Sequence, residues 1–161
     1  MLEKDHKNEQ PVLRTTPVVT NFLQRLDGPE PRICLVRRSQ RVGSYNAHWA
    51  GISGFIEQGV SPEEQAYTEI REETGLLPEQ VRLRRRGQVV EHIDEALGRH
   101  WLIHPFLFEV LTPEAIKLDW EAEELRWIIP DALTSYETVP KLLAAWFSAS
   151  QGEVVHTQME P

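Results

Sequence analysis

The chain contains 161 residues, of which 40% are hydrophobic, and carries a formal net charge of −8. This length and composition suit one globular domain with a hydrophobic core of its own. The acidic charge disfavours binding to polymeric nucleic acid, whose phosphates would be repelled, but it is compatible with a single nucleotide, which needs only a few local arginine or lysine side chains.

The cysteine content indicates a reducing compartment. The only cysteine, Cys34, cannot form an internal disulfide and lies in an apolar run, which is typical of a buried thiol. No apolar run is long enough to cross a membrane, and the charged N-terminal residues lack the apolar centre of a secretory signal. We therefore expect a cytoplasmic protein without a membrane span.

Two strands are expected near the start of the chain. Residues 1–16 are polar, and we expect a flexible N-terminal tail or an added strand there. Residues 18–26 and 32–38 have strand-like patterns, and the sequence Asp27-Gly28-Pro29 between them is a turn signal. The two segments are therefore predicted to form a hairpin.

A loop and a helix follow. Ser61 is suited to the N-cap of the helix, and Pro62 comes next, at a position where its missing N–H has no intrahelical partner to lose. Glu64 completes a capping box with Ser61. Gly75 suits the residue that ends a helix, and Pro78 prevents the helix from restarting.

The second half of the chain alternates between apolar and polar segments. Residues 81–90 and 100–111 are predicted to be strands, separated by a polar loop over 91–99. Pro105 within the second of these strands indicates a bulge or an edge, because proline cannot donate to a sheet. Residues 112–119 are expected to form a loop, and residues 125–129 a further strand.

A short helical turn at 130–133 and a helix over 141–149 are expected near the C-terminus. An apolar stripe of the helix is predicted to pack on the sheet, and it comprises Leu142, Leu143, Trp146 and Phe147. Residues 150–161 are expected to be a tail. Residues 17–149 therefore constitute the predicted domain.

Three glutamates of the first expected helix converge. At about 100° per residue, Glu69, Glu72 and Glu73 occupy one sector of its surface. Like charges at these spacings repel each other, and a divalent cation would remove the repulsion. Carboxylates without Cys or His suit Mg²⁺ or Mn²⁺. The alternative is a solvated acidic face, but Glu57 in the preceding loop is placed to join the cluster. The adjoining stripe, expected to face the core, is Ala66, Tyr67, Ile70 and Thr74.

Three arginines precede the loop. Arg37, Arg38 and Arg41 either form a solvated strand end or clamp the phosphates of a substrate, since the guanidinium fork matches phosphate oxygens.

The segment from Gly54 to Leu76 resembles the Nudix box. In that pattern Gly is followed, after five residues, by Glu, and after seven more by Arg-Glu-apolar-x-Glu-Glu-x-Gly-apolar. The matching positions are Gly54, Glu69, Ile70, Glu72, Glu73, Gly75 and Leu76. The resemblance is close over the box and loose, by order of elements, over residues 17–147. It implies an α/β/α sandwich with a mixed sheet, of the α+β class, and a pyrophosphohydrolase that cleaves a diphosphate linkage in a nucleoside diphosphate derivative.

The resemblance also implies roles for particular residues. Glu69, Glu72 and Glu73 would hold Mg²⁺ or Mn²⁺, with Glu57 and the backbone carbonyl of Ser53 as further ligands. Glu72 is the first candidate for the general base, and any of the four glutamates could serve instead.

Residues outside the box are candidates by the same resemblance. A glutamate of a late loop is the base or an extra ligand in several relatives, which makes Glu121 and Glu123 candidates. Trp49 corresponds to a tryptophan that precedes the box in relatives, where it is either a core residue or a platform for a base. An arginine in the region of Arg37 often contacts substrate. Many relatives form dimers, so a homodimer is a further expectation.

Two positions depart from the box. The family glutamate falls on Val60 and the family arginine on Thr68, and in relatives this pair is thought to orient the first helix glutamate. Because both partners are absent, no buried charge is left unpaired, and Val60 could pack on the methyl group of Thr68. Ser53 replaces a glycine of the loop, which would leave a backbone ligand unchanged.

Three hypotheses follow. The first is a metal-dependent diphosphatase acting on a nucleotide or nucleotide-sugar. The second is a catalytically weakened nucleotide-binding or regulatory module, suggested by Val60 and Thr68. The third is an isomerase of the isopentenyl type, which shares the fold but needs a cysteine or an equivalent acid in its pocket, and Cys34 lies on an early strand away from the expected position.

Overall fold

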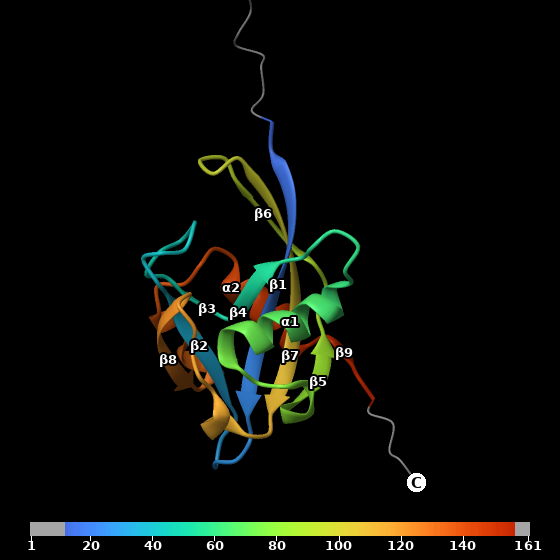
Figure 1. Ribbon diagram of the computed structural model, residues 1–161, viewed down its shortest axis with the longest axis vertical. Helices are drawn as coiled ribbons and strands as arrows, with labels where there is room; N and C mark the ends of the chain where they lie inside the picture. The colour runs from blue at the N-terminus through green and yellow to red at the C-terminus, as the bar shows by residue number, and fades with distance from the viewer. Residues whose placement is uncertain (1–11, 157–161) are drawn as a thin grey trace, which may run out of the picture.

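A mixed sheet forms the centre of the computed structural model, which describes residues 12–156 (Figure 1). Its strands within these residues are β1 (Arg14–Arg25), β2 (Arg32–Arg38), β3 (Trp49–Ala50), β4 (Ile52–Phe55), β5 (Val81–Arg86), β6 (Val90–Asp94), β7 (Arg99–Val110), β8 (Ala122–Ile128) and β9 (Glu153–Val154). The order is β3-β2-β1-β7-β5-β9, with β4 also paired to β1, β6 to β7 and β8 to β2. The long pair β1 and β7 is parallel, and the other pairs are antiparallel.

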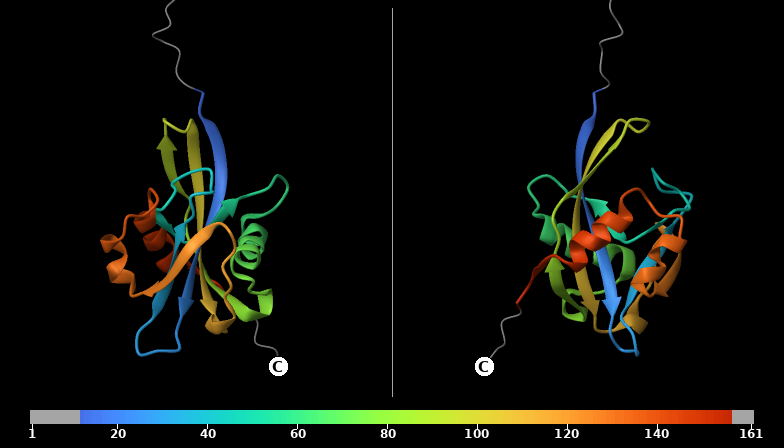
Figure 2. Two further views of the ribbon diagram at one scale, coloured as in Figure 1. Left: turned by 60° about the vertical axis from the view of Figure 1, so that its left-hand side comes forward. Right: turned by 180° about the vertical axis from the view of Figure 1, so that it is seen from behind.

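Helices cover both faces of the sheet (Figure 2). They are α1 (Pro62–Thr74) and α2 (Leu142–Ser150), with short 3₁₀ turns η2 (Pro78–Gln80), η3 (Pro113–Ala115) and η4 (Pro130–Ser135). Because strand side chains alternate, Val19 of β1 packs in the core under α1 and Phe22 in the core under α2. The α/β/α sandwich with a mixed sheet is therefore confirmed. Neither helix has the length and apolarity that crossing a bilayer requires.

Helix α1 begins and ends where its sequence predicts. The hydroxyl of Ser61 accepts a hydrogen bond from the N–H of Glu64 at 3.1 Å, and Gly75 ends the helix in the left-handed region with φ 75°. The predicted stripe faces the sheet, with Ala66 and Ile70 fully buried. Asn21 of β1 donates to the carbonyl of Ala66 at 3.2 Å, which fixes the height of the helix on the sheet.

The prediction of a loop over residues 91–99 is wrong. Most of it is β6 and a turn, and β6 pairs antiparallel with β7 from Val90–Ile103 to Asp94–Arg99. The strand was missed because it is an edge strand with a polar pattern, in which Glu91 pairs with His100 at 3.0 Å instead of burying an apolar group. Strand β1 begins at Arg14, in agreement with the added strand that was one of the two expectations for residues 1–16. Strand β9 lies within the expected C-terminal tail. Residues 1–11 and 157–161 of the expected tails fall outside the described residues.

Pro105 lies inside β7 without disrupting it. Its carbonyl accepts from the N–H of Gly87 at 2.9 Å, so the proline nitrogen also faces the side of β5 and β6. On that side β7 changes partner, from β6 up to Ile103 to β5 from Phe106 onwards. The missing N–H therefore falls between two short strands, at a local edge on that side of β7, whereas pairing with β1 continues through Pro105 on the other side.

The apolar stripe of α2 differs from the prediction. Leu142 and Trp146 are buried as expected, but Leu143 is on the outer face and Phe147 is 53% exposed. Their places in the core are taken by alanines, Ala145 and Ala149, because small side chains let the helix lie close to the sheet. Cys34 is buried in the other core, as predicted.

Candidate metal and substrate site

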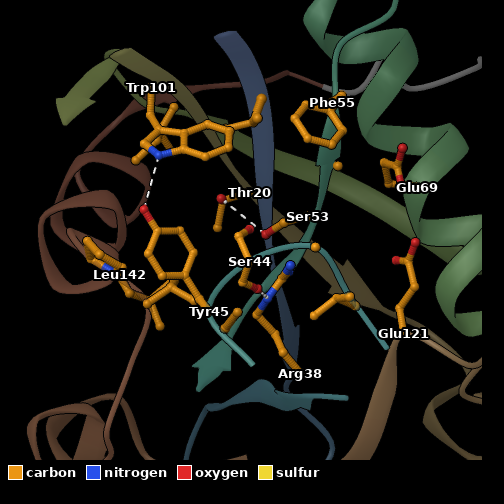
Figure 3. A pocket seen from close by; sticks show the side chains of 18 of the residues that line it. Thr20, Arg38, Ser44, Tyr45, Ser53, Phe55, Glu69, Trp101, Glu121 and Leu142 are labelled. Atoms are coloured by element: carbon orange, nitrogen blue, oxygen red, sulfur yellow. Dashed lines mark hydrogen bonds between the residues drawn. The ribbon is translucent and has the colours of Figure 1, made fainter. Parts of the chain in front are cut away.

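A cavity of about 390 Å³ lies between α1 and the start of α2. Its walls come from β1, β4, β7 and the loop between β2 and β3. Figure 3 shows Glu69 and Glu121 at one end and Trp101, Tyr45 and Leu142 at the other, with Arg38 between them. The cavity therefore has an acidic end and an end of aromatic and aliphatic side chains.

Three carboxylates meet next to the acidic end, where Glu69 and Glu121 line the cavity and Glu73 lies beside them without lining it. Glu69 and Glu73 of α1 and Glu121 each present an oxygen within 4.8 Å of the others. Glu69 is 8% and Glu73 only 6% exposed, and one carboxylate oxygen of Glu73, Oε2, is buried without a hydrogen-bond partner in the described part of the chain. A buried carboxylate oxygen that lacks a donor is suited to a cation. The residues present therefore fit Mg²⁺ or Mn²⁺, which prefer oxygen ligands.

Burial and mutual repulsion favour the protonated forms of these carboxylates. Burial raises the pKa of Glu69 to about 7, and the charges of Glu72 and Glu121 act in the same direction. Burial raises the pKa of Glu73 well above its ordinary value, again with help from Glu121 and Glu69, and burial also raises the pKa of Glu121. A cation would reverse this effect by stabilising the ionised forms.

We expect the metal-free protein to become less stable as the pH rises from about 5 to about 8. The folded pKa values of Glu69 and Glu73 are raised, so their contribution to stability is complete below about pH 4.5 and is lost as the pH rises through the folded pKa, which is about 7 for Glu69. Mn²⁺ should raise the unfolding temperature more at the higher pH, where protons compete less.

Thermal unfolding with EDTA or with Mn²⁺, followed across this pH range, measures both effects. The double variant Glu69→Gln/Glu73→Gln is the control and should flatten the pH dependence and the response to Mn²⁺. An unfolding temperature that has the same pH dependence in the parent and in this variant would contradict the assignment.

The other predicted ligands surround this cluster. Glu72 and Glu57 line the cavity and are exposed, so they face its interior without joining the buried group. Ser53 also lines the cavity, where its hydroxyl contacts that of Thr20 at 3.2 Å. Gly54 lies directly beneath the Glu69 carboxylate, which occupies the space that a Cβ atom would need.

The three arginines have separate environments. Arg38 lines the cavity, donates to the carbonyl of Ser44 at 2.9 Å and lies near the charges of Glu73 and Glu121; burial lowers its pKa and these charges raise it. Arg41 stacks over Trp120 with 5.3 Å to the ring centroid, and Trp120 lines the cavity.

Arg37 and Glu123 do not line the cavity. They face each other at 3.8 Å on neighbouring strands β2 and β8. Trp49 is also placed elsewhere: it is buried in the core under α2, where its ring packs edge-on against Tyr136.

Several cavity residues were not singled out from the sequence. The aromatic end is formed by Tyr45 and Trp101, whose indole N–H donates to the Tyr45 hydroxyl at 3.1 Å, and Phe55 lies near Trp101. Phe55 follows Gly54 in the box, so its position alone could have suggested it. Trp101 is brought to the cavity by β7 and Tyr45 by the loop between β2 and β3, and no local sequence pattern indicates either position.

Gln65 is a further residue that sequence reasoning missed. Its amide nitrogen donates to Glu69 at 3.0 Å, and its amide oxygen accepts from the backbone N–H of Glu57 at 3.1 Å. The signal that could have found it is its position four residues before Glu69, at which side chains on a helix meet.

Known proteins resemble this chain in sequence and in fold. A family model described as the NUDIX domain matches residues 15–148. A curated octanoyltransferase from Myxococcus xanthus is 30% identical over 142 residues, which are 87% of this chain; the chain spans 37% of the length of that relative.

Solved structures share the architecture. A Nudix hydrolase from Mycobacterium smegmatis, RenU, superimposes with a TM-score of 0.70 and 20% identity, covering 84% of both chains. The NUDIX domain of Shewanella oneidensis NrtR, complexed with ADP ribose, superimposes with a TM-score of 0.66 and 14% identity, covering 92% of both chains. At these identities the structures establish the fold. The family model spans most of the chain, and the chain therefore belongs to the Nudix family.

Proposed function

We propose that the protein hydrolyses a diphosphate linkage in a nucleoside diphosphate derivative and depends on Mg²⁺ or Mn²⁺. The observation that carries the proposal is the buried cluster of Glu69, Glu73 and Glu121, with an unpartnered Glu73 oxygen, at one end of a cavity with aromatic walls. A cavity that joins a cation site to aromatic rings suits a substrate with a charged diphosphate and a flat base.

Each residue of the acidic end has a proposed role. Glu69, Glu73 and Glu121 hold the cation, and Glu57 and the backbone carbonyl of Ser53 are further ligands. A divalent cation supplies positive charge that offsets the charge of the diphosphate and acidifies water. Glu72 accepts the proton of the attacking water, since it faces the cavity and lies outside the buried cluster.

Arg38 binds the diphosphate oxygens in this proposal, because it lies on the cavity wall near the acidic end. Arg41 lies behind Trp120 and assists by orienting that ring. Arg37, Glu123 and Trp49 have no role in the proposed chemistry, since they neither line the cavity nor belong to the carboxylate cluster.

The aromatic end is proposed to hold the nucleoside by stacking. The hydroxyl of Tyr45 donates to Asp94 at 2.7 Å and accepts from the indole N–H of Trp101. Because these polar groups are already hydrogen-bonded, Tyr45 and Trp101 present mainly ring surface to the cavity. Stacking on such surface tolerates different bases. The structure of the NrtR domain with ADP ribose supports this class of substrate, since ADP ribose is a nucleoside diphosphate derivative.

We expect phosphate release or phosphoanhydride cleavage with at least one member of a panel of nucleoside diphosphate sugars, dinucleotides and nucleoside triphosphates. Turnover should need Mg²⁺ or Mn²⁺ and fall by at least about 10²-fold with EDTA, because the diphosphate charge is then not offset. Binding of nucleotides without turnover of any compound, with either metal, would favour the alternative of a regulatory module. The isomerase hypothesis has no support, since Cys34 is buried away from the cavity.

A cytoplasmic location and a homodimer stay predictions. Light scattering coupled to size-exclusion chromatography would determine the oligomeric state.

A further inference from the structure

The amide of Gln65 connects two parts of the proposed metal site. Gln65 is 2% exposed and lies on α1, one turn before Glu69. Its side chain donates to the Glu69 carboxylate and accepts from the backbone N–H of Glu57 in the preceding loop. One side chain therefore ties the helix carboxylate to the loop that carries Glu57.

The chemistry of the two partners determines the orientation of this amide. In the ionised form that would bind a cation, the carboxylate of Glu69 can only accept, and the backbone N–H of Glu57 can only donate in any form. An amide that is rotated by 180° would place an oxygen against the carboxylate and its NH₂ group against an N–H. Only the observed orientation satisfies both contacts, so Gln65 holds a single conformation.

The resemblance to the Nudix box implies a charged pair that orients this glutamate, and both members of that pair are absent here. Val60 cannot form a hydrogen bond with its side chain, and the hydroxyl of Thr68 donates to the carbonyl of Glu64 at 3.1 Å, within its own helix. Neither side chain directs a donor to Glu69. Gln65 supplies that donor from a different turn of α1, and because it is neutral it leaves the full negative charge of Glu69 available to a cation.

Gly54 also contacts the Glu69 carboxylate. The carboxylate lies against the Gly54 backbone, in space that any side chain would fill. The group is therefore restricted by a hydrogen-bond donor, Gln65, and by contact with strand β4, to which Gly54 belongs. A ligand confined in this way needs less reordering when a cation binds.

We infer that Gln65 is a positioning residue, which orients Glu69 and the Glu57 loop for binding the divalent cation in place of the charged pair missing at Val60 and Thr68. The inference rests on the proposed function. Gln65 does not line the cavity, and it acts through Glu69 and Glu57.

The test is Gln65→Met, which keeps the length of the side chain and removes both hydrogen bonds. We expect the affinity for Mn²⁺, measured by titration of the protein without substrate, to fall by about 10- to 100-fold. The kcat should fall by a similar factor at a fixed subsaturating Mn²⁺ concentration, while the KM for the substrate stays within about threefold. Gln58→Met is the matched control, since Gln58 is an exposed residue of the loop that carries Glu57. This variant should bind Mn²⁺ like the parent.

A shorter amide provides a second variant. Gln65→Asn keeps a polar group in the buried position but cannot span both partners, so it should also weaken Mn²⁺ binding, and it decides the question if Gln65→Met does not fold. Parent-like Mn²⁺ affinity in a folded Gln65→Met or Gln65→Asn protein would overturn the inference. A parent protein that neither binds Mn²⁺ nor cleaves any diphosphate would instead overturn the proposed function, whatever the variants do.

Discussion

Glu73→Gln is expected to abolish metal-dependent turnover, with a loss in kcat of about 10³-fold or more, and to leave the fold intact. The substitution removes one of three clustered charges, and a metal ion contributes several kcal/mol to stabilising charge in the transition state, which corresponds to this loss in rate. Glutamine has the same shape, and its neutral amide can donate to the neighbouring carboxylates, Glu69 and Glu121. The metal-free variant should therefore be at least as stable as the parent protein.

Initial rates at saturating Mg²⁺, together with thermal unfolding in EDTA, measure both parts of this expectation. Glu79→Gln is the matched control, since Glu79 is exposed in η2 beyond the end of α1. It should retain the parent rate. A Glu73→Gln protein that cleaves diphosphates as fast as the parent would remove Glu73 from the metal site.

Gly54→Ala is expected to lower kcat by about 10²-fold with little change in stability. The new methyl group would occupy the space of the Glu69 carboxylate, so that group must move. Because it is the end of a flexible side chain, and because the strand conformation of β4 is accessible to alanine, the change in folding free energy should stay within about 1 kcal/mol. Displacement of a ligand by even about 1 Å is enough for the expected loss in rate.

Steady-state kinetics and Mn²⁺ titration, with thermal unfolding alongside, measure these quantities. Gly28→Ala is the control, because a Cβ atom at Gly28 meets no other atom within 4 Å. If Gly54→Ala kept the parent kcat and Mn²⁺ affinity, the position of the Glu69 carboxylate would not matter for the reaction.

Local signals made α1 predictable. Its capping residues and its apolar stripe depend on residues close in sequence, and the structure has them as expected. Of the three glutamates predicted to converge, Glu69 and Glu73 do so, whereas Glu72 is exposed outside the cluster. Strand β6 was missed because its own residues have no strand pattern, and it is stabilised by pairing with β7, which follows it in the chain. In α2, Leu143 and Phe147 were misplaced because a helix rich in apolar residues does not indicate which of its sides meets the sheet.

In the site, too, features that depend on distant strands could not be predicted from local sequence. Arg37 and Arg38 are neighbours on a strand, and their side chains point to opposite faces, so only one could line the cavity. Glu121 and Glu123 likewise differ in environment through the placement of β8 beside β2. Which member of each pair is near α1 depends on the packing of distant strands. The aromatic end depends on β7 in the same way.

The long parallel pairing of β1 with β7 has a consequence for how the protein folds. Val18 lies beside Ile103, so these two strands join only after most of the intervening chain has been brought together. The cavity takes walls from both strands, and its third carboxylate, Glu121, comes from a still later segment. During refolding, the ability to capture Mn²⁺ should therefore return late, after the secondary structure of α1 has recovered.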